Sequence, residues 1–172
     1  MLVVVGENAE FKGVEIVAIK NSEDNVDSRR LFFSSEEITD NSAPIATEDD
    51  IVAGKYLYEP DAALMKLNAS GALCRKYPGM KKLGGNTSLY ISSSCYEDFP
   101  GRIVNIMECV DKRELKRLKG SRLNVTVRNY PVPAEALRKK YGIKEGKDTF
   151  LYAFRATSRN IPMMLLGSRV SN

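Results

Sequence analysis

The fold is decided by residues 102–128, which read RIVNIMECVDKRELKRLKGSRLNVTVR. Branched and apolar residues dominate Arg102–Cys109 and predict a strand. Asp111 is suited to cap a short amphipathic helix over Lys112–Leu118. Apolar and polar residues then alternate from Leu123 to Val127, which is the period-two pattern of a half-buried strand. The stretch therefore predicts a strand, a helix and a second strand in succession.

The same alternation continues to the C-terminus. A second helix is expected over Pro133–Tyr141, because Pro suits a helix start and Gly142 a helix end. Two closing strands, Thr149–Arg155 and Ile161–Gly167, are joined by a turn over residues 158–160. The order β-α-β-α-β-β predicts a small α/β domain, of the α+β type, with a mixed sheet.

The N-terminal side is predicted to be richer in strands. Short strands are expected at Leu2–Val5, Val14–Ile19, Leu31–Ser34 and around Leu89–Ile91, and helical signals begin after residues 56–58. The acidic stretch from Glu36 to Asp50 is most simply a solvated connection. Pro60 suits the first turn of a helix, and a second short helix is expected over Ala72–Tyr77.

The formal charge changes sign along the chain. Residues 102–172 carry sixteen Lys and Arg against six Asp and Glu, a charge of +10. Residues 1–101 carry ten bases against sixteen acids, a charge of −6, so the whole chain has +4. The change coincides with the segment Phe99-Pro-Gly101, where Pro and Gly interrupt the pattern. We therefore expect two units, a strand-rich one over 1–100 and a basic one over 101–172.

The basic half is the electrostatic footprint of a domain that meets phosphates. On a helix, Lys112, Lys116 and Lys119 share one face, while leucines point the opposite way into the sheet. A solvated surface helix is the alternative for any single run of this kind. The candidate nucleic-acid-binding residues are Lys112, Arg113, Lys116, Arg117, Lys119, Arg122, Arg128, Arg138, Lys139 and Lys140.

No catalytic, cofactor-binding or metal-binding set of residues is expected. The chain has no histidine, which removes the commonest general base and metal ligand. Gly6 stands alone where a dinucleotide-binding loop needs three glycines, and Gly84-Gly85 lacks the Gly-Lys that follows in a phosphate loop. Its three cysteines lack a C-x-x-C spacing, which favours buried free thiols. No apolar run reaches the roughly 20 residues of a membrane span, so a cytoplasmic location is expected.

Three aromatic residues occupy alternate positions of one strand. Phe150, Tyr152 and Phe154 could stack on bases, as aromatics of some RNA-binding sheets do. The alternative is that they fill the core under the two helices, and this is favoured because helices must cover one face of the sheet.

Four segments resemble a known family. They are KYLYEPDAALMK at 55–66, DFPGR at 98–102, NVTVRNYP at 124–131 and EALRKKY at 135–141. These are similar to the C-terminal part of a bacterial class I S-adenosylmethionine-dependent methyltransferase family, where a ferredoxin-like segment precedes a THUMP-like domain. The resemblance covers about residues 55–169 and is loose over 1–50.

The resemblance implies a role in substrate recognition. It implies an RNA partner, tRNA or rRNA, and a methyltransferase domain upstream that binds S-adenosylmethionine. No cofactor is expected in these 172 residues, and they are not expected to be catalytic alone. The alternatives are a protein-interaction module that docks on the methyltransferase domain or another subunit, and, less favoured, an independent enzyme.

Overall fold

The computed structural model describes residues 2–4, 13–22, 25–40 and 42–170. Its strands are β1 Leu2–Val4, β2 Gly13–Ser22, β3 Asn25–Ser34, β4 Tyr56–Pro60, β5 Lys81–Gly84, β6 Thr87–Ser92, β7 Gly101–Cys109, β8 Asn124–Arg128, β9 Thr149–Ala156 and β10 Ile161–Arg169. Its helices are α1 Ser35–Thr39, α2 Ala62–Leu67, α3 Ser70–Lys76 and α4 Ala134–Tyr141, with 3₁₀ helices η1 Glu48–Asp50 and η2 Glu114–Leu118. Val5 and Gly6 lie outside the described residues.

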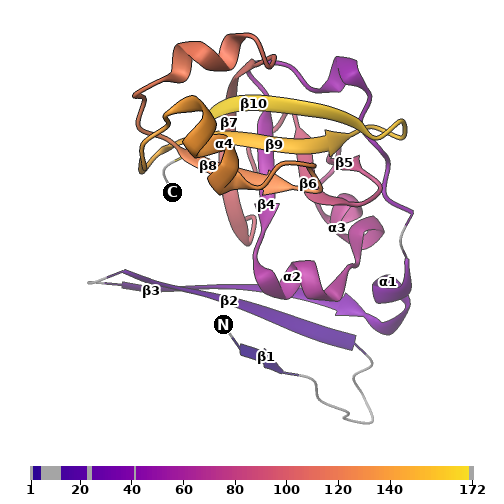
Figure 1. Ribbon diagram of the computed structural model, residues 1–172. Helices are drawn as coiled ribbons and strands as arrows, with labels where there is room; N and C mark the ends of the chain where they lie inside the picture. The colour runs from indigo at the N-terminus through magenta and orange to yellow at the C-terminus, as the bar shows by residue number, and fades with distance from the viewer. Residues whose placement is uncertain (1, 5–12, 23–24, 41, 171–172) are drawn as a thin grey trace.

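The main sheet has seven strands in the order β5-β6-β4-β7-β10-β9-β8. Strands β8 and β9 pair in parallel, and all other neighbours in this sheet are antiparallel. The predicted mixed α/β fold is therefore confirmed, and so is the order β-α-β-α-β-β over β7, η2, β8, α4, β9 and β10. A two-strand hairpin, β2–β3, and β1 form a separate three-stranded sheet (Figure 1).

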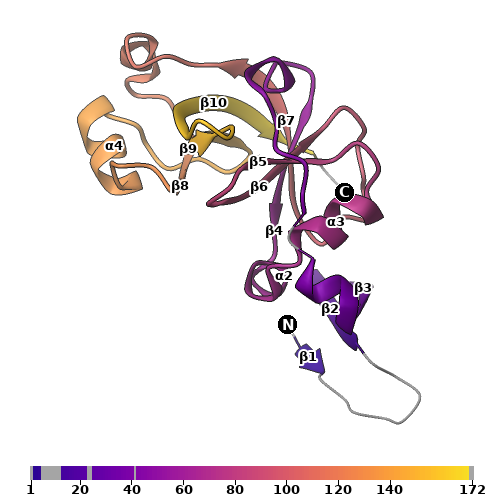
Figure 2. The same ribbon diagram turned by 90° about the vertical axis from the view of Figure 1, so that its right-hand side faces the viewer.

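The seven-stranded sheet curls until its β5–β6 end meets β9 (Figures 1 and 2). The backbone N–H of Thr157 donates to Leu83 O at 2.6 Å, and Thr87 Oγ1 donates to Arg155 O at 2.8 Å. Gly84 permits this approach, because a Cβ at that position would stand 2.8 Å from Arg155 O. The sheet thus resembles a barrel that is closed at this corner.

The concave side of the curled sheet is filled with apolar side chains. Phe150, Tyr152 and Phe154 lie there, at 0–2% exposure, together with Leu57 and Leu83. The favoured prediction for the aromatic residues, that they fill a core, is therefore confirmed. The prediction that this core lies under the two helices is wrong. The aromatic side chains face the inside of the curled sheet, and the alternation of residues in a strand does not show which element covers each face.

Helix α4 and η2 cover the opposite, convex side of the C-terminal strands. Leu115 and Leu118 of η2 and Leu137 of α4 are buried against Leu151 and Ala153 of β9. The inward direction predicted for the two η2 leucines is thus confirmed. Burying five or six such side chains contributes roughly 1.5–3 kcal/mol each, which is what holds η2 and α4 on the sheet.

The segment between β4 and β7 forms a second apolar cluster beside the main sheet. Helices α2 and α3 pack through Leu64 and Leu73 against Tyr58, Phe99 and the N-terminal sheet. Phe33 of β3 is fully buried in the same cluster. The N-terminal sheet is therefore anchored to the rest of the chain by an apolar contact, below α2 in Figure 1.

Three local predictions need correction. Pro60 is the last residue of β4, and the helix begins two residues later at Ala62 after the N-cap Asp61. The acidic stretch is more ordered than a plain connection, because Ser34 and Glu37 form a capping box that starts α1. Strand β5 was not predicted, since its four residues carry two lysines and two buried residues and give little periodicity.

The predicted boundary at residues 100 and 101 falls between two parts of one sheet. Strand β7 begins at Gly101 and pairs with β4, which belongs to the N-terminal part. The concave core likewise mixes Leu57 and Ile91 with Val104 and Leu165 from beyond the boundary. Separate folding of the two parts stays an untested prediction. The shared core means that dividing the chain at this boundary would expose apolar side chains of both parts.

Candidate nucleic-acid interface

The end of η2 and the end of α4 lie side by side in the structure. The backbone N–H of Gly120 donates to Gly142 O at 2.9 Å, and that of Lys144 to Ser121 O at 2.9 Å. Leu123 N–H then donates to Lys144 O at 3.0 Å. Gly142, which has φ +63° and ends α4 as predicted, turns the chain back toward these partners. Two segments that are separated in the sequence are thereby fixed next to each other.

These two ends carry a group of basic side chains that we call the basic surface. Lys119 and Arg122 follow η2, and Lys144 lies opposite Arg122 across the backbone pairing. All six members are exposed, and within the described part of the chain none has a carboxylate within 4 Å. The basic surface consists of Lys116, Lys119, Arg122, Lys139, Lys140 and Lys144.

The geometry of η2 differs from the predicted helix. It is a 3₁₀ helix over Glu114–Leu118, so Lys112 and Lys119 lie outside it and the three lysines do not line one face of an α-helix as predicted. Asp111 Oδ1 accepts from the N–H groups of Glu114 at 2.9 Å and Arg113 at 2.6 Å, so Asp111 caps the turn that leads into η2, whereas the N-cap of η2 itself is Arg113 and not Asp111 as predicted. These hydrogen bonds lower the pKa of Asp111. The backbone contact between Gly120 and Gly142, not helical spacing, brings Lys119 to the end of α4.

The other predicted residues lie elsewhere or have partners. Lys112 and Arg113 are exposed at the start of η2, beside Tyr130 and Met163. Arg117 pairs with Glu108 at 2.6 Å, and Arg138 approaches the exposed Glu145 at 3.9 Å. Of the ten residues selected from the sequence, five therefore belong to the basic surface: Lys116, Lys119, Arg122, Lys139 and Lys140.

Arg128 belongs to a different group, which we call the closure cluster. It consists of Glu59, Arg102, Arg128 and Tyr152, from β4, β7, β8 and β9. Glu59 is 7% exposed and accepts from Arg102 Nη1 at 2.7 Å, Tyr152 Oη at 2.8 Å and Arg128 Nη2. Burial and the Glu59 carboxylate raise the pKa of Tyr152, which keeps the hydroxyl protonated as a donor. The cluster ties four strands together across the concave side of the sheet.

Lys144 was missed in the sequence. It stands alone in a short connection after α4, and only the backbone pairing with Ser121 and Leu123 brings it to the basic surface. No local pattern indicates that pairing, because β8, α4 and the connection between them separate the two segments. The charge of the whole region was the one signal that included it.

Chemical sites are scarce among the residues described. That part of the chain holds no group of three or more His, Cys, Asp or Glu placed to bind a metal ion. The three cysteines are free thiols as predicted, but only Cys74 is buried, where burial raises its pKa to about 11. None of the described helices has the length and apolar character needed to span a membrane.

Comparison with known proteins agrees with the order of these parts. Residues 56–100 match a family described as a ferredoxin-like domain, and residues 101–169 match one described as THUMP domain-like. The chain thus contains the two modules, in the order that the resemblance implied. No curated protein matches the sequence.

A solved structure is also similar to this chain. It is the crystal structure of a "putative methyltransferase" from Porphyromonas gingivalis W83, with 26% sequence identity and a TM-score of 0.73. The similarity covers 92% of this chain and 38% of that protein. The chain therefore spans well under half of the length of the protein it resembles.

Proposed function

We propose that the chain is the RNA-recognition region of an S-adenosylmethionine-dependent RNA methyltransferase, and that the basic surface contacts the RNA backbone. The observation that carries the proposal is the convergence of six exposed bases, without carboxylate partners among the described residues, on a THUMP-like domain. THUMP-like domains are of an RNA-binding type, and the similar solved protein is described as a methyltransferase. The expected partners are tRNA or rRNA.

Simple surface solvation is the alternative explanation for these bases. Lys139 and Lys140 lie in the last turn of α4, where bases are also favoured by the negative end of the helix. Lys116 lies in the last turn of η2 in the same way, but the effect does not account for Lys119, Arg122 and Lys144, which come from two connections. Contacts with RNA phosphates account for all six, because each base can neutralise one phosphate. Each such contact favours binding by releasing condensed counterions.

The test is the salt dependence of RNA binding, measured by fluorescence anisotropy with a structured RNA. For about five phosphate contacts we expect the affinity to fall roughly 10²–10³-fold between about 50 and 200 mM salt. Structured RNA should bind better than duplex DNA, because an A-form shape and 2′-hydroxyls are absent from DNA. Lys119→Glu with Arg122→Glu should weaken binding at least about tenfold and reduce the salt slope by about two.

A matched control is available on the N-terminal half. Lys66 and Lys76 are exposed helical lysines outside the basic surface, and changing both to Glu alters the net charge equally. We expect this control to keep most of the affinity. Equal losses in both double variants would show a general charge effect and would contradict a defined interface.

The second candidate function is a docking module for another protein domain. It is favoured by the ion pairs in which bases of residues 101–169 already meet acids of the preceding part, Glu59 with Arg102 and Arg128, and Glu48 with Arg159. If the purified chain shows no salt-dependent RNA affinity and the charge reversal instead releases a protein partner, this candidate replaces the first.

Methyl transfer itself is assigned to the remainder of the parent protein. We expect the 172 residues alone not to bind S-adenosylmethionine, because the chain has no glycine-rich cofactor loop. Titration calorimetry checks this directly. A stoichiometric site of micromolar affinity would contradict the assignment and would make the chain a candidate enzyme.

A further inference from the structure

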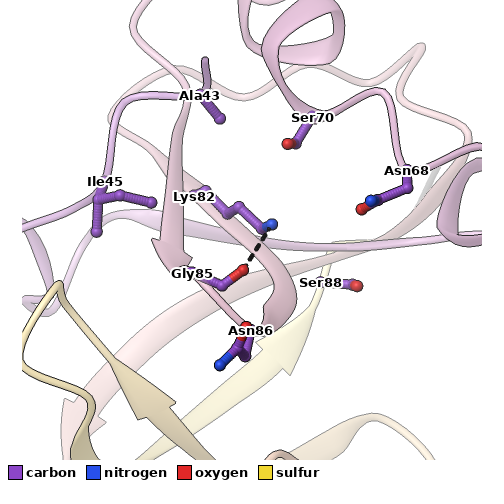
Figure 3. Close-up of a pocket in the computed structure, with 8 residues that line it drawn as sticks. All are labelled: Ala43, Ile45, Asn68, Ser70, Lys82, Gly85, Asn86 and Ser88. Atoms are coloured by element: carbon purple, nitrogen blue, oxygen red, sulfur yellow. Dashed lines mark hydrogen bonds between the residues drawn. The ribbon is translucent and has the colours of Figure 1, made fainter. Parts of the chain in front are cut away.

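A polar pocket of about 450 Å³ lies away from the basic surface, between β5, β6 and the α2–α3 connection. Figure 3 shows the ammonium group of Lys82 inside it, with Asn68 extending from the α2–α3 connection and Ser70 from the first residue of α3. Asn86 and Ser88 line it from the β5–β6 hairpin. The pocket therefore gathers one cation, two amides and two hydroxyl groups, and its lining includes no Asp or Glu.

The backbone fixes Lys82 at this place. Its N–H donates to Pro44 O and its carbonyl accepts from Ala46 N–H, both at 2.8 Å. The ammonium donates to Gly85 O at 3.0 Å, which leaves two of its three hydrogens for other acceptors. Among the described residues no carboxylate forms an ion pair with it, and burial lowers its pKa. Lys81 beside it is instead paired with Asp50 at 2.8 Å.

The neutral polar groups of the pocket are also available. Among the residues that line the pocket, Figure 3 draws one hydrogen bond, from Lys82 to Gly85, and it draws none to the side chains of Asn68, Ser70, Asn86 and Ser88. Ser70 is only 2% exposed, so its hydroxyl has little access to water except through the pocket. Asn68 and Asn86 are exposed and Ser88 is half-buried, so these groups can take hydrogen-bond partners that enter the pocket. A ligand that accepts several hydrogen bonds would supply those partners.

We infer that this pocket binds a phosphate monoester, carried by a small molecule or by an RNA end. A phosphate group offers three acceptor oxygens and a negative charge, which match the ammonium, amide and hydroxyl donors that meet here. Ala43 and Ile45 give the pocket an apolar wall for the organic part of the ester. The inference does not depend on the RNA-binding proposal, because the two surfaces share no residue.

The test uses the whole chain labelled with ¹⁵N and titrated with glycerol phosphate at constant ionic strength. We expect saturable shifts at Ser70, Gly85, Asn86 and Ser88, and much smaller ones with acetate. Lys82→Gln should weaken the affinity at least about tenfold, because it removes the charge and leaves a neutral amide on a slightly shorter side chain. Lys81→Gln is the matched control and should bind as the unaltered chain does.

Asn68→Gly provides a second variant that is independent of the lysine. Asn68 has φ +55°, a conformation that glycine adopts freely, so the change removes the amide without straining the backbone. It should weaken binding severalfold. Titration with a 5′-phosphorylated trinucleotide and its 5′-hydroxyl counterpart distinguishes an RNA end from a small ester. Shifts that do not saturate, or that persist in both Lys82→Gln and Asn68→Gly, would overturn the inference.

Discussion

The closure cluster and the basic surface use the same residue types for opposite purposes. In the closure cluster, Arg102 and Arg128 surround a carboxylate that is 7% exposed, and their guanidinium groups hold β4, β7, β8 and β9 together. In the basic surface, Lys119 and Arg122 face solvent, and no acid of the described chain pairs with them. The formal charge counts both sets equally. The position of the nearest carboxylate, not the number of bases, separates a structural arginine from a candidate RNA contact.

The largest effect is expected when the concave core that contains the closure cluster is divided. Residues 102–172 expressed alone would expose Phe150, Tyr152 and Phe154, whose neighbours Leu57 and Leu83 belong to the first half. The charge pattern of the sequence predicts that this fragment folds, but the shared core leads us to expect that it does not unfold cooperatively. Thermal denaturation followed by circular dichroism distinguishes the two. A sharp transition would support two separate units.

A smaller loss is expected when the carboxylate of the closure cluster is removed. Glu59→Ala leaves two guanidinium groups without their counter-ion, and each also has a buried Nε without a partner among the described residues. Because both arginines remain about one-third exposed, water offsets part of the penalty, and we expect a loss of about 2–3 kcal/mol in the free energy of unfolding. Urea denaturation measures it.

The exposed ion pair between Arg138 and Glu145 is the control for that change. Glu145→Ala removes a carboxylate that is 79% exposed, so the free energy of unfolding should change by less than about 0.5 kcal/mol. A similar loss for Glu59→Ala and Glu145→Ala would show that the closure cluster does not stabilise the sheet more than a surface pair does.

The next prediction distinguishes the closure cluster from the basic surface by two measurements, the free energy of unfolding and the RNA affinity. Arg128→Ala should lower the free energy of unfolding by about 1–2 kcal/mol and leave the RNA affinity of the folded chain nearly unchanged. Lys139→Ala with Lys140→Ala should do the reverse, weakening RNA binding about three- to tenfold at unchanged stability. If Arg128→Ala weakens RNA binding as much as the lysine pair, Arg128 is part of the interface, as the sequence alone suggested.

Much of the fold could be predicted because it follows from local sequence patterns. The alternation over Leu123–Val127 and the Pro and Gly at the ends of α4 gave β8 and α4 almost to the residue. The curling of the sheet could not be predicted, since it depends on a contact between Leu83 and Thr157, 74 residues apart. That contact lies at the closed corner of the concave side, and the helices cover the other side of β9.

The candidate interface was predicted in the same uneven way. The sequence identified most of its bases from charge alone, but it placed Arg128 with them, although Glu59 is 69 residues away in the chain and adjacent in space. It also omitted Lys144, which joins the basic surface through backbone pairing. Local spacing indicates which residues are basic and exposed, while ion pairs between distant strands appear only in the folded chain.

The smallest expected effect concerns β5, where Lys81 is paired with Asp50 while Lys82 has no carboxylate partner among the described residues. The hydrogen bond from Lys81 and the N–H of Thr47 lower the pKa of Asp50 to about 2, from an ordinary value of 3.8. A carboxyl group with a lowered pKa stabilises the fold at pH values above 3.8, and that contribution is lost as the pH falls through about 2. Asp50→Asn should therefore lower the urea midpoint at pH 6. The difference from the unaltered chain should shrink between pH 4 and pH 2, while the exposed neighbour variant Asp49→Asn shows little difference throughout. A gap between Asp50→Asn and the unaltered chain that stays constant down to pH 2 would mean that the ion pair with Lys81 does not contribute through its charge.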